Sequence, residues 1–341
     1  MIYVGMDVSS KSFMIHAINE RKKVVLKKEI EPTRAGLREM VDELGPQSKV
    51  IVFEAGNQLK WIALTLRKID SVDVHVVHPN EVNWIIKSKK KTDKVDAKKL
   101  AELARADMLP RKVHVVEGKA RELRELAAAR SQLQSKRVGL VNTIRGYMKQ
   151  EGVRLPAKFF GSKNRSQELR DLKVSRSLKI IIESFLKGIE ALEKCEKEIE
   201  SNLCEIKDSR IELLESIPSI GKLTARILVG AIDDVNRFES KKSIARYGAL
   251  TPTLYQSGDV IQLGRINNDG RREVRGILLQ CAHCITRMKS PAVKPLKDFF
   301  ERIAAKRGKK IAIVALARKL LTTSFGVLRN GEFYDPKMLA A

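Results

Sequence analysis

The sequence predicts a mixed α/β fold for about the first third of the chain and a mainly helical fold for the rest. Two observations support this prediction. Before Gly118, short apolar runs rich in Val, Ile and Tyr alternate with amphipathic segments, a pattern typical of strands joined by helices. From Gly118 onward, apolar residues recur in steps of three and four, which is helical spacing.

The first apolar run, residues 1–8, is predicted to be a buried central strand, yet it contains Asp7. A carboxylate in a buried strand is costly unless something pairs with it. Where several carboxylates meet, a divalent metal ion is the usual partner. Asp7 is therefore the first candidate metal ligand.

Three further acids occur where such a fold could bring them to Asp7. A second strand of the same kind ends in Glu54, and a helix opens with Asp93 and Asp96. These two residues are three positions apart and so share one helical face. Four carboxylates suit a pair of Mg²⁺ ions in a nuclease-type site. The alternative, four unrelated surface acids, does not account for their order along the chain.

The remaining elements of the first third follow from the same patterns. We expect further strands at residues 13–18, 22–30 and 72–77, helices at residues 32–44 and 61–66, and a short helix before Asp93. The first three strands can form a meander, whereas the later strands need helical crossovers and should be parallel. This order resembles the ribonuclease-H-like fold in the version used by the RuvC Holliday-junction resolvase. That fold places metal ligands on its first strand, fourth strand and final helix.

Two runs of heptad spacing follow, at residues 123–147 and 178–213, separated by a polar, irregular stretch. They predict two long helices that form an antiparallel coiled-coil arm, which could also pair between subunits. Four charged residues interrupt the apolar positions. We expect them to fix the helix register rather than to act chemically. They are Arg130, Arg137, Glu196 and Arg210.

The last third opens with residues 217–225, which look like a helix-hairpin-helix. In that motif a tight turn, here at Gly221 and Lys222, presents backbone N–H groups to a phosphate. Ser219 replaces the usual first glycine, and a plain helix–turn–helix packing element is the alternative. Glycines and basic residues are then dense up to Arg275, as expected of loops close to a phosphate backbone. Two apolar helices are expected to complete the core.

The charge of the chain points to a polyanionic partner. Lys and Arg number 66 against 41 Asp and Glu, so the net charge is +25. Nucleic acid is the first candidate for a protein this basic. Aromatic residues make up only 5% of the chain, which argues against stacking on single-stranded bases as the main contact. The candidate nucleic-acid contacts are Lys89, Lys90, Lys91, Gly221, Lys222, Arg265, Arg271, Arg272 and Arg275.

We expect a protein of the reducing cytoplasm without a membrane anchor. Met1 leads directly into a strand, and we expect no apolar run to be long enough to span a bilayer. Four cysteines do not indicate a disulfide framework. Cys281, His283 and Cys284 could be half of a zinc site, but no matching second pair follows, so we interpret them as ordinary helix residues.

The acids, the arm and the C-terminal motifs together resemble the DEDD transposases typified by insertion sequence 110, described as bridge-RNA-guided recombinases. The resemblance covers essentially the whole chain. It rests on the Lys-Thr-Asp-x-x-Asp-Ala segment ending at residue 97, the Ile-Pro-x-Ile-Gly-x-x-Thr-Ala segment at 217–225, and Gln-Ser-Gly at 256–258. It implies a RuvC-like catalytic domain at residues 1–117, a coiled-coil arm at 118–212 and a C-terminal transposase domain at 213–341.

The resemblance also implies a mechanism. Asp7, Glu54, Asp93 and Asp96 would bind Mg²⁺, and Ser257 would attack a DNA phosphate and become covalently linked to it. A non-coding guide RNA would pair with donor and target DNA. The protein would be a cytoplasmic, nucleoid-associated protein of a prokaryote. Dimers would assemble into a tetramer in which the acidic domain of one subunit meets the serine domain of another.

Two other functions compete with this one. The first is a metal-only RuvC-like endonuclease or junction resolvase, in which Ser257 is merely a turn residue beside Gly258. The second is a nucleic-acid-binding protein that kept the fold without catalysis, which the intact acidic set argues against. A serine hydroxyl is a weak nucleophile and needs activation, and the nearest histidine in sequence is His283. Metal ions held by the four acids could supply that activation.

Overall fold

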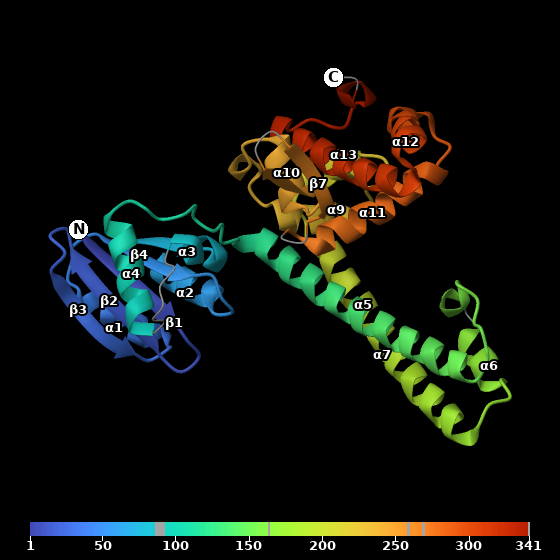
Figure 1. Cartoon of the computed structure of the whole chain (residues 1–341), viewed down its shortest axis with the longest axis horizontal. Coiled ribbons are helices and arrows are strands. Elements are labelled where there is room, and N and C mark those ends of the chain that lie inside the picture. Colours follow the sequence, from blue (N-terminus) through green and yellow to red (C-terminus); the bar gives the residue numbers. More distant parts are fainter. Residues whose placement is uncertain (86–92, 163, 258–259, 268–269, 340–341) are drawn as a thin grey trace. The chain divides into compact units, whose positions relative to one another are not determined.

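The computed structural model describes residues 1–85, 93–162, 164–257, 260–267 and 270–339. It consists of two compact units, Met1–Val115 and Val116–Ala341 (Figure 1). The first unit is mixed α/β and the second is mostly helical, as the sequence predicts. The finer division into three domains, with an arm at residues 118–212, stays a prediction.

The first unit contains one five-stranded sheet with the order β3-β2-β1-β4-β5. Its strands are β1 (Ile2–Val8), β2 (Phe13–Asn19), β3 (Val24–Ile30), β4 (Lys49–Glu54) and β5 (Val72–Val77). The first three strands pair antiparallel, whereas β1–β4 and β4–β5 pair parallel. The predicted meander and parallel crossovers are therefore confirmed, in an arrangement consistent with a ribonuclease-H-like domain.

Helices cover both faces of this sheet. They are α1 (Arg34–Glu43), α2 (Leu59–Leu66), α3 (Pro79–Ile85) and α4 (Asp93–Arg105). On one face α1 and α2 pack with Val4 and Met6 in a large apolar cluster. On the other face Leu100 of α4 packs with Val52. Helix α1 begins where the sequence predicts, because the Thr33 hydroxyl accepts a hydrogen bond of 3.0 Å from the Gly36 N–H.

Helix α4 approaches β1 closely at Gly5. A Cβ atom placed on Gly5 would lie 2.6 Å from the backbone nitrogen of Ala101 and even closer to the carbonyl oxygen of Ala97. Because both contacts are backbone atoms, neither can rotate away. We expect Gly5→Ala to destabilise the first unit by about 3 kcal/mol, the upper end of the usual cost of overpacking. Thermal unfolding measures this loss. Gly56→Ala is the control, since nothing lies within 4 Å of a Cβ at Gly56. Equal melting temperatures for the two variants would contradict the predicted clash at Gly5.

The second unit begins with two long helices, α5 (Gly118–Gln150) and α7 (Arg176–Glu205), that pack along each other. They run antiparallel, since Arg130 binds Glu200 at 2.6 Å and Arg137 binds Glu196 at 2.7 Å. These two pairs cross between the helices, as expected of register-fixing residues. The supercoil of a true coiled coil stays a prediction.

The second heptad run is shorter than predicted. Helix α7 ends at Glu205, and Asp208 starts the new helix α8 (Ser209–Glu215) by accepting a hydrogen bond from the Arg210 N–H at 3.0 Å. An aspartate at this position is a strong helix start, and it overrides the apolar spacing that continues to residue 213. The expectation that Arg210 fixes the arm register is wrong, because its guanidinium instead binds Asp208 and the carbonyl of Asp233.

The polar stretch between the arm helices is less irregular than predicted. It contains a 3₁₀ turn, Phe159–Gly161, and the short helix α6 (Arg165–Arg170). Leu169 of α6 is buried with Ile144 and Leu186 in a separate apolar cluster at this end of the arm. A local core therefore holds the far end of the two helices together.

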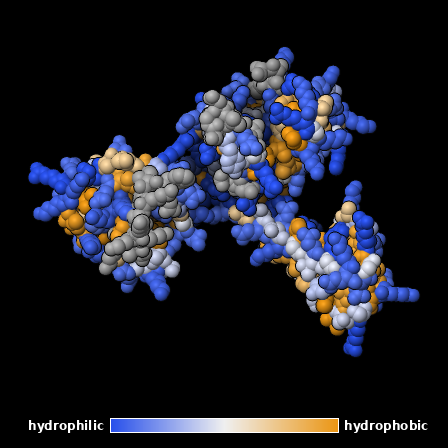
Figure 2. All heavy atoms as spheres, viewed as in Figure 1, coloured by the Kyte–Doolittle hydropathy of each residue, from blue (hydrophilic) through white to orange (hydrophobic). Residues whose placement is uncertain are grey.

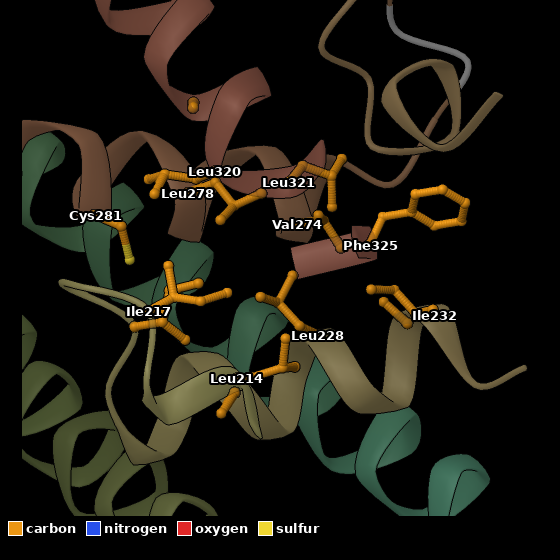
Figure 3. Packing of buried hydrophobic residues seen from close by; sticks show 14 of the residues in the cluster. Leu214, Ile217, Leu228, Ile232, Val274, Leu278, Cys281, Leu320, Leu321 and Phe325 are labelled. Carbon is orange, nitrogen blue, oxygen red and sulfur yellow. The ribbon is translucent and has the colours of Figure 1, made fainter. Parts of the chain in front are cut away.

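Helices α8, α9, α11 and α13 build the main core of the second unit (Figure 3). The elements after α8 are α9 (Lys222–Ile232), α10 (Lys241–Tyr247), β6 (Pro252–Ser257), β7 (Val260–Ile266), α11 (Arg272–Arg287), α12 (Lys294–Arg307) and α13 (Lys309–Asn330). Figure 3 shows Leu228 of α9 between Leu214 of α8 and the side chains of α11 and α13. Each such buried side chain contributes about 1.5–3 kcal/mol of apolar burial.

Two expectations about this part change. The glycine-rich stretch expected as loops contains a hairpin of two antiparallel strands, β6 and β7. Helix α13 is, by length and composition, apolar enough to cross a membrane, contrary to the expectation that no run is. Leu316, Leu320 and Phe325 of α13 are nevertheless buried in the core, as in the central helix of a soluble domain. Hydrophilic residues cover most of the visible surface (Figure 2).

Candidate active site

Asp7 and Glu54 lie at the ends of two neighbouring parallel strands. The β1–β4 register pairs Met6 with Phe53, so the residues that follow, Asp7 and Glu54, reach the same edge of the sheet. Tyr3 and Val52 pack in the cluster on the α4 face. Because side chains alternate along a strand, Asp7 and Glu54 lie on that face too. Both are only partly exposed.

Helix α4 brings the other two acids to the same end of the sheet. Its residue Ala97 lies against Gly5, and its later residues Leu100 and Ala104 belong to the cluster that includes Tyr3. The helix therefore runs opposite to β1, and its first turn lies at the Asp7 end. Asp93 begins this turn and Asp96 follows one turn later. The side chain of Asp93 lies outside the described residues, so the structure places it by its backbone.

The donor chemistry of this arrangement fits a hard divalent cation. Carboxylates from two strand ends and one helix turn supply the oxygen ligands that Mg²⁺ prefers. Among the side chains that the structure describes, no three Asp, Glu, His or Cys residues already converge on a common point. The fold thus brings the four backbone positions to one end of the sheet, and binding of an ion would complete the convergence of the side chains.

His16 lies beside this site and was not singled out by the sequence. It pairs with Gly5 across β1 and β2 and is buried. Burial, followed by the charges of Lys27 and Lys98, lowers the pKa of the His16 imidazole, while Glu102 acts in the opposite direction. No local sequence pattern indicates this environment of His16, because Lys98 and Glu102 belong to helix α4, which only the fold brings close to His16.

The lowered pKa of His16 predicts a pH dependence. In the unfolded chain the imidazole takes up a proton near its ordinary pKa of about 6.5, whereas the folded chain resists protonation until lower pH. The contribution of His16 to stability is therefore complete above the pKa of the unfolded state. It falls as the pH drops below that value toward the lower pKa of the folded state. We expect a lower melting temperature at acidic than at neutral pH, and a weaker response in His16→Gln. His78→Gln, at an exposed position, should respond like the wild type. A wild-type melting temperature that does not change would contradict this expectation.

Ser257 is the last residue of β6 and pairs with Val260 of β7. Its side chain lies outside the described residues, as does Gly258. The base of the hairpin is fixed, because the Asn267 N–H donates to the Thr251 carbonyl at 2.9 Å. The structure thus places the candidate nucleophile near the tip of a hairpin whose base is held by the helical core.

The four arginines predicted near Ser257 divide into two kinds. Arg265 on β7 and Arg272 at the start of α11 are exposed. Arg275 donates to the Asn267 carbonyl at 3.1 Å, and Arg271 forms an ion pair with Glu273. Two arginines are therefore open to a phosphate, whereas Arg271 and Arg275 already bind other groups of the protein.

A cluster around Tyr247 was missed by sequence reasoning. The Tyr247 hydroxyl donates to the Ala231 carbonyl at 2.8 Å and accepts from Arg124 at 3.1 Å and from Arg271 at 3.3 Å. Burial alone would raise the pKa of this phenol, but the charges of Arg271, Arg124 and Arg237 outweigh it and lower the pKa. The cluster joins the arm helix α5, the end of α9 and the base of the hairpin. Arg124 and Tyr247 are 123 positions apart, so no local pattern indicates the contact.

The remaining predicted contacts are only partly described. Ser219, in the turn before α9, has φ of 71°, the left-handed conformation that the missing glycine would favour. Gly221 precedes the first residue of α9, and both Gly221 and Lys222 are exposed. The geometry is compatible with a helix-hairpin-helix, which stays a prediction. Lys89, Lys90 and Lys91 lie outside the described residues.

The acids lie in the first unit and Ser257 in the second, and comparisons with known proteins match both. Residues 4–152 match the family model of DEDD transposases of the IS110 type, described as "Transposase". Residues 211–297 match a second model, described as "Transposase IS116/IS110/IS902 family". One family model therefore covers all four acids, and the other covers Ser257.

Individual relatives carry related names. A pilin gene-inverting protein of Moraxella bovis is 36% identical over 131 residues, which cover 38% of this chain and 40% of that protein. A probable family 20 transposase of Pseudomonas aeruginosa is 22% identical over 98% of both chains. A transposase for insertion sequence element IS1111A of Coxiella burnetii is 25% identical over 97% of this chain and 90% of its own length. The Moraxella match thus spans less than half of that relative, whereas the other two matches span nearly the whole proteins.

Proposed function

We propose that this chain, which belongs to the IS110 family of transposases, cuts and rejoins DNA strands when an insertion sequence moves. One observation carries the proposal most directly. The acids of β1 and β4 and the acid-bearing first turn of α4 lie at one end of the sheet. The names of the relatives, which include transposases and a pilin gene-inverting protein, support DNA rearrangement as the process.

In the proposed site Asp7, Glu54, Asp93 and Asp96 hold divalent cations, for which two Mg²⁺ ions are the simplest choice. When bound, such ions stabilise negative charge on a phosphate and help to activate a hydroxyl. The carboxylates orient the ions. The close packing of α4 on Gly5 keeps the helix acids in register with the strand acids.

Ser257 is the proposed nucleophile. Its oxygen forms a bond to phosphorus, the bond from phosphorus to one deoxyribose oxygen breaks, and the serine proton leaves with that oxygen or with solvent. One phosphoester replaces another, so a second strand end can reverse the step without ATP. Arg265 and Arg272, exposed beside the hairpin, are positioned to hold the flanking phosphates.

The other proposed contacts are with nucleic acid. Gly221 and Lys222 would contact a DNA phosphate through the exposed turn before α9, and Lys89, Lys90 and Lys91 would add a basic contact near the acids. A guide RNA would pair with donor and target DNA, and dimers would assemble into a tetramer. The net charge of +25 supports binding to DNA, RNA and the nucleoid of a prokaryotic cytoplasm.

The metal-only nuclease is the second candidate, because cations held by the four acids could cleave a phosphodiester without the serine. An assay of supercoiled DNA nicking tests the proposal against the non-catalytic alternative, and the Ser257→Ala variant tests it against the metal-only nuclease. The full chain, with Mg²⁺ and candidate guide RNA from the flanking element, should nick DNA and lose this activity in EDTA. A protein that binds DNA with the same affinity but never cuts it under these conditions would be the non-catalytic alternative.

A further inference from the structure

Cations from two other helices of the second unit act on Lys319, which lies beside the ring of Phe299. The guanidinium carbon of Arg302 on α12 lies 5.7 Å from the centre of the Phe299 ring, and the Lys319 amine on α13 lies 5.8 Å from it. Lys241 begins α10, a helix that packs against α13. Its charge and that of Arg302 both act on Lys319. The fold, and not one basic run of sequence, assembles this group.

In the part of the chain that the structure describes, this group has no acid as an ion-pair partner. Within the described ranges, no ion pair involves Lys241, Arg302 or Lys319, whereas Arg137 and Arg165 on the arm both bind carboxylates. Burial, followed by the charges of Lys241 and Arg302, lowers the pKa of the Lys319 amine. The protonated form of Lys319 is thus disfavoured by its neighbours, and a bound anion would reverse that effect.

We propose that Lys241, Arg302 and Lys319 form a binding site for the backbone phosphates of duplex DNA, separate from the residues assigned to strand cleavage. Ammonium and guanidinium groups are the common phosphate-binding groups of proteins. Duplex DNA suits the site better than single strands, because two cations already lie against the Phe299 ring that a base would need for stacking. The choice of DNA as the ligand rests on the proposed function.

The salt dependence of binding tests the site. The full chain in EDTA is titrated with a fluorescent DNA duplex over a range of salt concentrations, comparing wild type with the triple variant Lys241→Gln, Arg302→Gln, Lys319→Gln. Each lost phosphate contact lowers the slope of log affinity against log salt by about 0.9, so the triple variant should lose up to about 2.7. The control removes the same charge from exposed arm lysines through Lys149→Gln, Lys194→Gln and Lys197→Gln, and should leave the slope nearly unchanged.

An equal loss in both triple variants would show a diffuse basic surface and overturn the proposal. A loss of affinity for RNA, with affinity for duplex DNA intact, would overturn it as a DNA site. Labelling of the wild type with an amine-reactive ester avoids dependence on variant folding. DNA should protect Lys319 but not Lys194, and an unprotected Lys319 would contradict the proposal. Since these readouts need neither metal nor cleavage, they are independent of whether the proposed reaction occurs.

Discussion

Asp7→Asn is expected to reduce DNA strand cleavage by roughly a thousandfold, because losing several kcal/mol of metal-mediated charge stabilisation costs about tenfold in rate for each 1.36 kcal/mol. Asparagine keeps the size and one oxygen of the side chain but removes the charge that holds the cation. Asp96→Asn should act similarly, since its helix turn lies at the same end of the sheet. The measurement is the single-turnover rate of nicking with Mg²⁺.

Glu102→Gln is the matched control for these variants. Glu102 is an exposed acid of the same helix α4, beyond Ala97 and Ala101, which contact Gly5. The Glu102→Gln variant should therefore cleave DNA at the wild-type rate. DNA affinity and melting temperature should stay close to wild type in all three variants, which separates a catalytic loss from unfolding. Full cleavage by Asp7→Asn would remove the acidic site from the mechanism.

Ser257→Ala is expected to eliminate strand cleavage, because the proposed reaction has no second nucleophile. The variant removes one oxygen from the end of β6, whose register with β7 depends on backbone pairing. Tyr255→Phe is the control, since Tyr255 is 64% exposed on the same strand and carries another hydroxyl. It should cleave normally. The readout is cleavage of labelled duplex DNA with guide RNA and Mg²⁺.

Normal cleavage by Ser257→Ala would favour the metal-only nuclease, with Ser257 as a turn residue. A mixture of Ser257→Ala and Asp7→Asn proteins adds a test of shared sites. If different subunits supply the serine and the acids, as the family resemblance implies, mixing two inactive variants should restore part of the activity. No recovery, from proteins that still form oligomers, would place both halves of the site on one chain.

The sheet and the positions of its acids were predictable because their signals are local. Strand periodicity identifies β1 and β4, and the parallel crossover rule puts Asp7 and Glu54 at one edge. The spacing of Asp93 and Asp96 likewise follows from one helix turn. What sequence could not supply is the approach of α4 to Gly5, because only the packed structure shows a backbone contact between residues so far apart.

The elements that differ from the prediction depend on a competing local signal or on pairing between segments. Asp208 starts a new helix where the heptad spacing continues, so a capping signal outweighs apolar periodicity. The sequence predicts loops where β6 and β7 form a hairpin, because glycines and basic residues are dense in this stretch and the pairing of the two strands is not visible in the composition. The contacts of Tyr247 join helices that are distant in sequence, and no sequence spacing predicts them.

The most direct test of the proposed chemistry is to identify the residue that carries DNA after the reaction is stopped by denaturation. Wild-type protein is incubated with substrate DNA, guide RNA and Mg²⁺, digested with protease and nuclease, and analysed by mass spectrometry for a nucleotide-bearing peptide. We expect the modified peptide to contain Ser257, and to be missing in Asp7→Asn and in EDTA. DNA attached to any other residue, or strand cleavage with no attached DNA, would contradict the account.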